Sequence, residues 1–328
     1  ECLLDYQRKL STNEVDSLDE LQEVQIAFGK VLEENAALKE ELNSFHALFG
    51  TVGDASSQFA MMQRCDEFGV SVEEMAFDFK KMQQYKKKAV KSYRRSVEEQ
   101  FEKLGIELIH GRAVIRRDCH VEVYTDSGKD YLQAKNIIIA TGAQARMPDI
   151  PGIDLAGVYG SDQLLGANSW KFDRIAIVGG GVIGVEMATI FSSLCSKVTI
   201  IEQGSQLLGP MDQDVARALE KELKEKGISV YCDTSVLEIT ERSDGLVCRV
   251  ARDGKEQDIA AGQVLMAIGR SPYMEGLFGE DVEFEMEKGR LAVNDRFMTS
   301  VPGIYAIGDV VADIQLAHVA AAQGTFVV

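Results

Sequence analysis

The chain has 328 residues, which is enough for about two domains of ordinary size. Hydrophobic residues make up 45% of it and charged residues 27%, with only 5 prolines, which excludes a disordered, collagen-like or low-complexity chain. The net charge of −17 opposes binding to nucleic acid or to an anionic membrane surface, so neither is an expected partner. The sequence has no apolar stretch of about 18 residues and no signal-peptide pattern, so we expect a cytoplasmic protein.

The six cysteines and four histidines form no pattern typical of a metal site or a redox centre. The cysteines stand at positions 2, 65, 119, 195, 232 and 248, so no CxxC or CxxxxC pair occurs. We therefore predict buried thiols in a reducing compartment and no metal ion. The chain starts at Glu1 and ends in an apolar run without a helix stop signal, from which we expect that both ends were cut.

The first predicted element is a helix over residues 21 to 45. Its mostly apolar a and d positions recur at alternating spacings of three and four and form a heptad seam. Asn35 stands at an a position of this heptad seam, where a buried Asn favours a paired register. Two interpretations stay open: a two-stranded coiled coil, or a single amphipathic helix packed on its own domain.

A second helix is predicted over residues 79 to 104, with Gly105 as its stop. One stripe of this helix is expected to be buried, namely Val90, Tyr93, Val97, Phe101 and Leu104. The opposite face is basic, and the acidic charge of the whole chain favours a solvated face over a nucleic-acid surface.

After this helix, short strand-like runs alternate with turns and helical stretches, as in a parallel sheet with crossover helices. The runs cover residues 106–109, 121–124, 136–140, 174–178, 197–202 and 263–268. The predicted fold class is therefore α/β.

The strongest motif follows the run 174–178 and reads Gly-Gly-Gly-Val-Ile-Gly from 179 to 184. In a strand-to-helix turn, Gly179 permits the tight turn, Gly181 lets the backbone approach a pyrophosphate, and Gly184 lets the helix pack closely on the strand. The helix N-terminus adds N–H donors and a favourable dipole for phosphate. The alternative is a glycine-rich turn that serves packing alone.

Glu202 gives this motif its context, because it ends the next strand, 21 residues beyond Gly181. In dinucleotide-binding domains an acid at about 20 residues binds the adenosine ribose. No Arg or Lys follows Glu202 closely, so the carboxylate favours NAD over NADP. The alternative for Glu202 is a solvated acid at a strand end.

Two further strands end in small residues, one at Gly142 and one at Gly308 and Asp309. Such ends bring backbone close to a ligand at the carboxyl edge of a sheet. Asp309 could hold a hydroxyl-rich ligand or cap a helix that begins near Leu316, and both interpretations stay open.

Taken in order, these segments resemble the flavin-dependent pyridine nucleotide-disulfide oxidoreductases. The resemblance rests on ATG at 140–142, GGGVIG at 179–184, AIGRSP at 267–272 and GIYAIGDV at 303–310, and it covers about residues 65–328. The runs at 148–153 and 316–324 are most similar to the dihydrolipoamide dehydrogenase branch.

The resemblance implies a Rossmann-like NAD domain inserted in a partial FAD-binding domain, preceded here by the long N-terminal helix. The implied domains are a helical segment and linker (1–60), a partial FAD-binding domain (61–150), the NAD-binding domain (151–272) and a return segment of the FAD-binding domain (273–328).

The resemblance also implies site residues for two cofactors, FAD and NAD. For FAD they are Ala113 beside the adenine, Thr141 and Gly142 beside the flavin nucleotide, Asp309 on the ribitol, and Ala317 and His318 near the isoalloxazine. For NAD they are Gly179, Gly181, Val182, Ile183, Gly184 and Glu202 on the adenosine half, Val236 beside the adenine and Gly269 near the nicotinamide. Glu186 matches the family glutamate that pairs with a lysine beside the flavin, and it is the one catalytic residue implied.

The sequence departs from the family pattern in three respects. A first GxGxxG, a CxxxxC redox pair and a C-terminal interface domain with its histidine are absent from these 328 residues. In the family reaction a dihydrolipoyl dithiol reduces the redox disulfide, and electrons then pass to FAD and NAD. Because the cysteine pair and the histidine are missing, we expect the chain to be inactive in this reaction on its own.

Three functions stay open at this point. The first is the dihydrolipoyl dehydrogenase-like oxidoreductase, a homodimer acting on a small-molecule or lipoyl-domain substrate of 2-oxo acid dehydrogenase complexes. The second is another NADH-dependent disulfide reductase or an NADH oxidase. The third is a non-catalytic NAD-binding module dimerised by residues 21–45.

Overall fold

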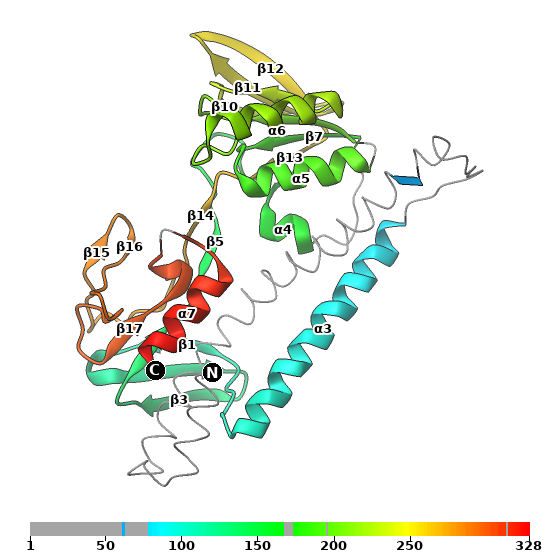
Figure 1. Cartoon of the computed structure of the whole chain (residues 1–328). Coiled ribbons are helices and arrows are strands. Elements are labelled where there is room, and N and C mark those ends of the chain that lie inside the picture. Colours follow the sequence, from blue (N-terminus) through cyan, green and yellow to red (C-terminus); the bar gives the residue numbers. More distant parts are fainter. Residues whose placement is uncertain (1–60, 63–77, 167–172, 195, 313) are drawn as a thin grey trace. The chain divides into compact units, whose positions relative to one another are not determined.

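The computed structural model describes residues 61–62, 78–166, 173–194, 196–312 and 314–328, and these form two compact units (Figure 1). The inserted unit consists of Ala145–Arg270 with the start of helix α3 up to Lys91, and the outer unit consists of Ser92–Gln144 and Ser271–Val328. The chain passes between them along two paired strands, β5 (Ala143–Ala145) and β14 (Arg270–Pro272). The predicted helix over 21–45 lies outside the described residues.

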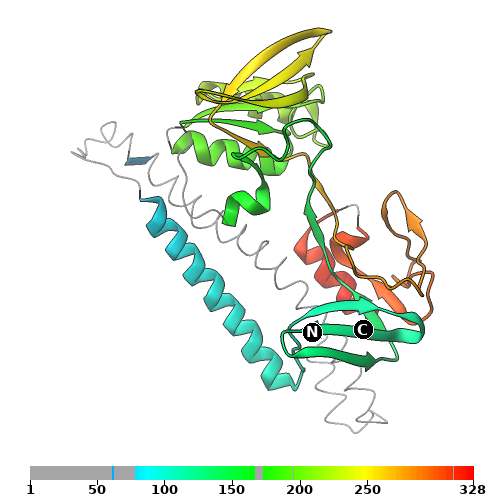
Figure 2. The same ribbon diagram turned by 180° about the vertical axis from the view of Figure 1, so that it is seen from behind.

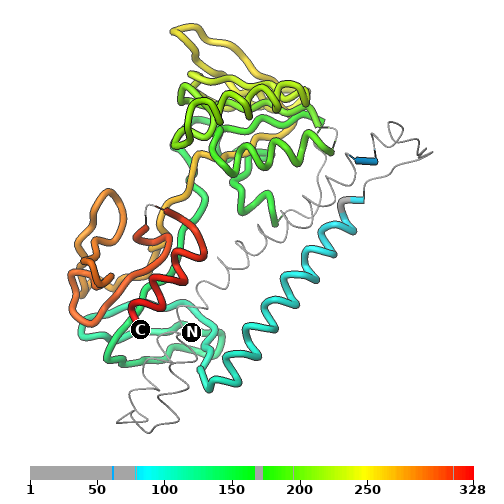
Figure 3. The backbone as a smooth tube through the Cα atoms, in the orientation of Figure 1, coloured from blue at the N-terminus to red at the C-terminus, as the bar shows by residue number. Residues whose placement is uncertain are grey.

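Helix α3 spans Phe79–Leu104 and confirms the predicted bounds (Figure 3). Gly105 ends it in a left-handed conformation with φ +68°, and the N–H of Ile106 donates to the carbonyl of Phe101 at 2.9 Å. This is a Schellman-type helix end, in which glycine adopts the positive φ without strain. It leads the chain directly toward β1, so the predicted strand over 106–109 is wrong.

The buried stripe of α3 is narrower than predicted. Val90 and Phe101 are buried, whereas Tyr93 is 52% and Leu104 43% exposed. Both exposed residues stand three positions after a buried one, which turns them about 60° around the helix. The basic side chains of α3 other than the buried Lys86 are exposed, and Arg95 pairs with Glu99 on the helix surface at 2.9 Å.

The inserted unit is built on a five-stranded parallel sheet with the order β6-β13-β7-β8-β9. Its strands are β6 (Val158–Gly160), β7 (Arg174–Val178), β8 (Lys197–Ile201), β9 (Ser229–Tyr231) and β13 (Gln263–Met266). The predicted α/β class with a parallel sheet is confirmed. Because β13 and β8 flank β7, the turns that follow these three strands meet at one edge of the sheet.

Both faces of this sheet are covered, as parallel sheets require (Figures 1 and 2). Helices α4 (Ser161–Gly166), α5 (Val182–Ser193) and α6 (Gln213–Glu225) pack on one face around a core that includes Leu164, Phe191 and Leu223. The antiparallel strands β10 (Ser235–Arg242), β11 (Gly245–Arg252) and β12 (Lys255–Ala261) pack on the other face.

The sequence analysis did not predict the three strands β10 to β12. Ser243-Asp244 joins β10 to β11, which begins at Gly245, and Asp253-Gly254 joins β11 to β12; both glycines have positive φ. Asp-Gly between two apolar runs is a strong hairpin signal, so this part of the fold was readable from the sequence.

The outer unit contains a parallel pair and an antiparallel sheet. The parallel pair is β4 (Ile137–Ile139) with β17 (Ile304–Ala306). The remaining elements are β1 (Arg112–Ile115), η2 (Arg117–Cys119), β2 (His120–Thr125), β3 (Gly128–Gln133), β15 (Met286–Glu287), β16 (Arg290–Leu291), η3 (Gly308–Val310) and α7 (Ala317–Val327). Strands β1 and β2 share a hydrophobic core with the parallel pair, with Ile115, Val121, Ile139 and Ile304 among its members.

Three cysteines fall within the described residues, and none of them forms a disulfide there. Cys248 is buried as predicted, and burial raises the pKa of its thiol to about 12. Cys119 and Cys232 are only half-buried, which corrects the prediction of buried thiols for these two. No helix in the described part of the chain is long and apolar enough to cross a membrane.

Candidate functional site

The glycine-rich turn after β7 is held by two close backbone approaches. Gly179 has φ +110°, and a Cβ there would lie 2.3 Å from the carbonyl oxygen of Ala267. A Cβ on Gly184 would lie 2.0 Å from the carbonyl oxygen of Gly179. Any larger side chain at either position would displace backbone, so these two glycines are required for the turn and for packing of α5.

Gly181 differs from these two glycines because the space around it is open. It is the N-cap of α5, it is exposed, and a Cβ there would have no atom within 4 Å. No side chain caps the helix at this residue, so the first N–H groups of α5 can donate to a bound anion. Val182 is 55% exposed and Ile183 half-buried beside this helix end.

Glu202 follows β8 and lies directly against the glycine turn. Its Oε2 accepts a hydrogen bond from the N–H of Gly180 at 2.5 Å, and its Oε1 accepts one from the N–H of Gly204 at 2.6 Å. Each carboxylate oxygen keeps further acceptor capacity for a hydroxyl group. The carboxylate is therefore bonded to the residue that precedes Gly181. A ribose next to a pyrophosphate at Gly181 would lie within its reach.

A third turn follows β13 on the opposite side of β7. The N–H of Ala267 donates to the carbonyl of Val178 at 2.7 Å, which continues the strand pairing into the turn. Gly269 then adopts φ +104°, is exposed, and would meet no atom with a Cβ. Turns bearing Glu202, Gly181 and Gly269 are thus arranged in a row along three neighbouring strands, the geometry of a dinucleotide crevice.

Two other implied residues of the inserted unit lie beside this row. Val236 is half-buried on β10, close to Thr234, whose N–H donates to the carbonyl of Glu202 at 2.9 Å. Glu186 is half-buried on α5, and burial raises the pKa of its carboxyl group. These observations define no role for Val236 or Glu186. Their assignments to the adenine and to a lysine beside the flavin therefore stay predictions.

The sequence analysis missed Asp162 and Arg270 in this unit. Arg270 Nη1 lies 2.9 Å from Asp162 Oδ1, and both side chains are largely buried. Arg270 falls in the AIGRSP motif and directly follows Gly269, which was a usable signal. Asp162 has no sequence signal beyond its place just after a strand.

In the outer unit, β4 and β17 bring two small-residue turns to a common edge. The N–H of Ile307 donates to the carbonyl of Ile139 at 2.9 Å. Thr141 is buried, and its hydroxyl donates to the carbonyl of Tyr273 at 2.6 Å. Gly142 and Gly308 both have φ +71°. The predicted residues Thr141, Gly142 and Asp309 therefore follow paired strand ends.

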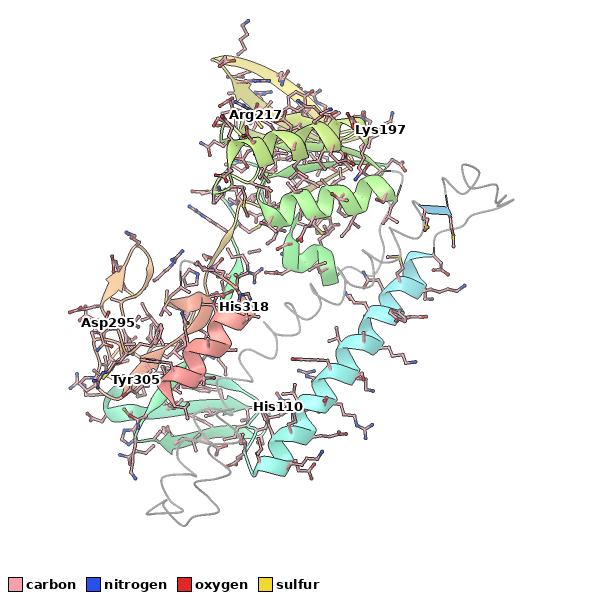
Figure 4. The ribbon with its side chains drawn as sticks, viewed as in Figure 1. His110, Lys197, Arg217, Asp295, Tyr305 and His318 are labelled. Atoms are coloured by element: carbon pink, nitrogen blue, oxygen red, sulfur yellow. The ribbon has the colours of Figure 1, made fainter. Side chains whose placement is uncertain are left out.

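Asp309 lies half-buried in the short helix η3, which is fixed by Gln323, a residue of the run 316–324 to which the sequence analysis gave no role. The Oε1 atom of Gln323 on α7 accepts a hydrogen bond from the N–H of Gly308 at 2.6 Å. Ala317 and His318 are exposed at the N-terminal end of α7, where Figure 4 labels His318. The N-cap of α7 is Leu316, and both interpretations of Asp309, as a ligand for hydroxyl groups and as a helix cap, stay open.

Ala113 lies apart from the turns after β4 and β17, on the antiparallel sheet. It is buried in β1, two residues after the exposed Gly111. A Cβ on Gly111 would lie 2.5 Å from the carbonyl oxygen of Tyr124, so a glycine is needed at this strand entry. No cluster of three or more His, Cys, Asp or Glu that could hold a metal occurs among the described residues.

The two units fit their implied cofactors to different degrees. The inserted unit offers an open helix N-terminus for a pyrophosphate, a carboxylate for a ribose and an open glycine for the second half of a dinucleotide. The outer unit offers paired strand ends with an acid, Asp309, and two left-handed glycines. The residues therefore fit the pyrophosphate and the adenosine ribose of NAD(H), with open space at Gly269, and they fit FAD at the strand ends after β4 and β17.

Comparison with known proteins gives a consistent result. Residues 22–324 match the family model described as pyridine nucleotide-disulphide oxidoreductase. The chain is 37% identical over 271 residues to a dihydrolipoyl dehydrogenase of Acholeplasma laidlawii, covering 81% of this chain and 77% of that protein. It is 33% identical to a dihydrolipoyl dehydrogenase of Bacillus subtilis (strain 168), covering 81% of this chain and 58% of that protein.

Among solved structures, the chain is similar to the HOCl-induced flavoprotein disulfide reductase RclA from Escherichia coli. The TM-score is 0.72 at 26% identity, over 84% of this chain and 59% of that one. The chain thus spans between half and four-fifths of the length of the relatives compared, namely 58% of the Bacillus protein and 77% of the Acholeplasma protein.

Proposed function

Because this chain belongs to the pyridine nucleotide-disulphide oxidoreductase family, whose cofactors are FAD and NAD(H), we propose that it is part of a flavoprotein of the dihydrolipoyl dehydrogenase type. The inserted unit binds NAD(H), the outer unit binds FAD, and the electron donor is a dihydrolipoyl dithiol on a small molecule or a lipoyl domain. The row of turns bearing Glu202, Gly181 and Gly269 is the observation that supports this proposal most strongly.

The residues of the inserted unit would bind the nucleotide in a fixed order. The N–H groups at the start of α5, from Gly181 to Gly184, would donate to the pyrophosphate, with Val182 and Ile183 beside it. Glu202 would accept hydroxyl groups of the adenosine ribose, and Val236 would flank the adenine. Gly269 would leave room for the nicotinamide.

In the outer unit, Asp309 would accept ribitol hydroxyl groups, while Thr141 and Gly142 would line the flavin nucleotide. Ala113 would contact the adenine, and Ala317 and His318 would approach the flavin ring. Bound FAD would supply two-electron chemistry between a dithiol and NAD. The dithiol itself would need a redox disulfide, and no CxxxxC pair occurs in this sequence.

The remaining expectations rest on the family resemblance. We infer that the active flavoprotein is a homodimer and that Glu186 acts beside the flavin, where its raised pKa would let it hold a proton more readily than an exposed glutamate. The cytoplasmic location and the domain boundaries also stay predictions.

The experiment that tests this proposal has two parts. NADH is titrated into the purified 328-residue chain, and FAD is then added and NADH oxidation is followed with an artificial electron acceptor. We expect saturable NADH binding, flavin-dependent oxidation with the artificial acceptor, and no turnover with lipoamide. Absence of NADH binding by a folded chain would contradict the proposal at its first step.

The third function, a non-catalytic NAD-binding module, is favoured by one observation: all three turns of the proposed nucleotide crevice belong to the inserted unit. The same experiment distinguishes it. A chain that binds NADH but shows no flavin-dependent oxidation at saturating FAD would be such a module.

A further inference from the structure

The Asp162 side chain stands on a rigid base. Helix α4 is short, but Leu164 and Leu165 are fully buried in the core of the inserted unit, and Ser161 is buried as well. The ammonium group of Lys86, itself buried on α3, donates to the carbonyl of Leu165 at 2.5 Å. The helix that carries Asp162 is therefore held at its apolar face and at its C-terminal end.

The two oxygens of Asp162 connect the two points where the chain enters and leaves the inserted unit. Oδ2 accepts a hydrogen bond from the N–H of Ala145 at 3.0 Å, at the end of β5. Oδ1 accepts one from Arg270 Nη1 at 2.9 Å, at the start of β14. The exposed fractions of the Arg270 and Asp162 side chains are 16% and 15%, so water screens this ion pair only weakly.

Gly269 is tied to the same pair of strands. It directly precedes Arg270, and its carbonyl accepts a hydrogen bond from the N–H of Arg146 at 3.0 Å. Gly269 has no side chain of its own to fix it, and the space beside it is open. Its position therefore depends on its neighbours, and Asp162 fixes the neighbours on both strands, Ala145 and Arg270.

We propose that Asp162, acting through Arg270 and Ala145, is a positioning residue for the nicotinamide half of the bound dinucleotide. This inference rests on the proposed NAD(H) site. The pair is at the far side of β7 from Glu202, so it acts on one half of the ligand and leaves the adenosine half untouched. Loss of one charge would leave the other poorly compensated and release the turn at Gly269.

The test compares two ligands that differ only in the half at issue. NADH carries the nicotinamide, and ADP-ribose carries the same adenosine and pyrophosphate without it. In Asp162→Asn we expect NADH affinity to fall about tenfold, while ADP-ribose affinity changes less than about twofold. Asp244→Asn is the matched control, because the Asp244 carboxylate also accepts a hydrogen bond from an arginine, Arg174 of β7 at 3.4 Å, but its side chain is 67% exposed. It should alter neither affinity.

A second variant approaches the pair from the other side. Arg270→Gln should reproduce the selective loss of NADH affinity. The double variant should lose no more NADH affinity than either single variant, because both substitutions remove the same ion pair. Thermal unfolding of each variant reports whether it is folded. If Asp162→Asn is not folded, the comparison of the two ligands is made with Arg270→Gln.

Each outcome has one meaning. Equal losses for NADH and ADP-ribose, or no loss for either, would overturn the positioning role while leaving the NAD(H) site in place. Failure of the unsubstituted chain to bind NADH at all would instead contradict the proposed function.

Discussion

The inserted and outer units both end parallel strands in small residues, yet they differ in how the turns are supported. In the inserted unit three turns stand on adjacent strands, and the glycine turn is locked by backbone on one side and by Glu202 on the other. In the outer unit two turns stand on a two-stranded parallel pair, fixed by Thr141 and Gln323. In the first arrangement the N-terminus of α5 directly follows the glycine turn, whereas in the second the chain passes through η3 before α7 begins at Ala317.

This difference indicates where binding energy would come from. A pyrophosphate is bound most strongly by the clustered N–H groups and the dipole of a helix N-terminus. Hydroxyl groups need only single hydrogen-bond acceptors, and rings need only small residues beside them. The inserted unit should therefore hold its nucleotide by itself, and the outer unit should hold its nucleotide weakly.

The largest expected effect follows directly from this comparison. The purified 328-residue chain should bind NADH but lose FAD during gel filtration, because the sequence contains a single GxGxxG and that one lies in the proposed NAD(H) site. Each charge-assisted hydrogen bond contributes about 1.5–3 kcal/mol to binding. A chain without the set that holds the FAD pyrophosphate should therefore bind FAD more weakly by several powers of ten. The visible spectrum after gel filtration measures it. A stable yellow protein that reduces lipoamide would contradict the comparison.

The second effect is confined to the inserted unit. Gly181→Val should lower NADH affinity at least about a hundredfold, because the new side chain fills the open space where a pyrophosphate approaches. The melting temperature should stay nearly unchanged, since a Cβ at Gly181 meets no atom within 4 Å. Calorimetric titration and thermal unfolding measure the two quantities.

Gly184→Val is the control for this prediction, because it separates a blocked site from a damaged fold. Its Cβ would lie 2.0 Å from the carbonyl oxygen of Gly179, so the melting temperature itself should drop. Unchanged NADH affinity in Gly181→Val would mean that the turn serves packing alone.

The sequence predicted the parts of both units that depend on local signals. The bounds of α3 followed from its periodicity and from Gly105, and the order of β7, the glycine turn, α5 and β8 followed from the motif itself. The turn residues after β4 and β17 were also visible as strands ending in glycine.

Two contacts that the sequence did not predict depend on partners distant along the chain. The bond from Asp162 to Arg270 spans 108 positions and the bond from Thr141 to Tyr273 spans 132, so no periodicity reveals them. Residues 106–109 are apolar enough for a strand, but the helix end at Gly105 directs them straight into β1. Strand formation requires a neighbouring strand, which local composition does not specify.

A third, smaller effect concerns the choice of nucleotide. NADPH should bind about a hundredfold more weakly than NADH, because the carboxylate of Glu202 would face the additional phosphate. In Glu202→Gln the amide has only one oxygen, so it cannot accept both hydrogen bonds, from the N–H of Gly180 and from that of Gly204. The preference for NADH over NADPH should therefore shrink, and the free energy of unfolding should fall by about 1–3 kcal/mol. Glu225→Gln, on the exposed surface of α6, is the matched control. Equal affinity for the two nucleotides in the unsubstituted chain would remove Glu202 from the site.

The smallest effect lies in the outer unit and depends on pH. Glu122 on β2 accepts hydrogen bonds from Lys129 at 2.9 Å, from Arg116 at 3.1 Å and from the hydroxyl of Tyr124 at 2.9 Å. These donors lower the pKa of Glu122 from 4.5 to about 2. A pKa that is lower in the folded state stabilises the fold above the unfolded value, and this contribution is lost as the pH falls from about 4.5 toward 2.

Glu122→Gln should therefore unfold at a lower temperature than the unsubstituted chain at pH 7, and the difference should narrow as the pH falls from 4.5 toward 2. Glu287→Gln, an exposed glutamate on β15 in the same unit, is the control and should change the melting temperature little at any of these pH values. NADH should not restore the loss in Glu122→Gln if it binds the inserted unit alone, because a ligand stabilises only the unit that holds it. A difference that stays constant from pH 7 to pH 2 would show that packing of the side chain, and not its charge, stabilises the outer unit at this position.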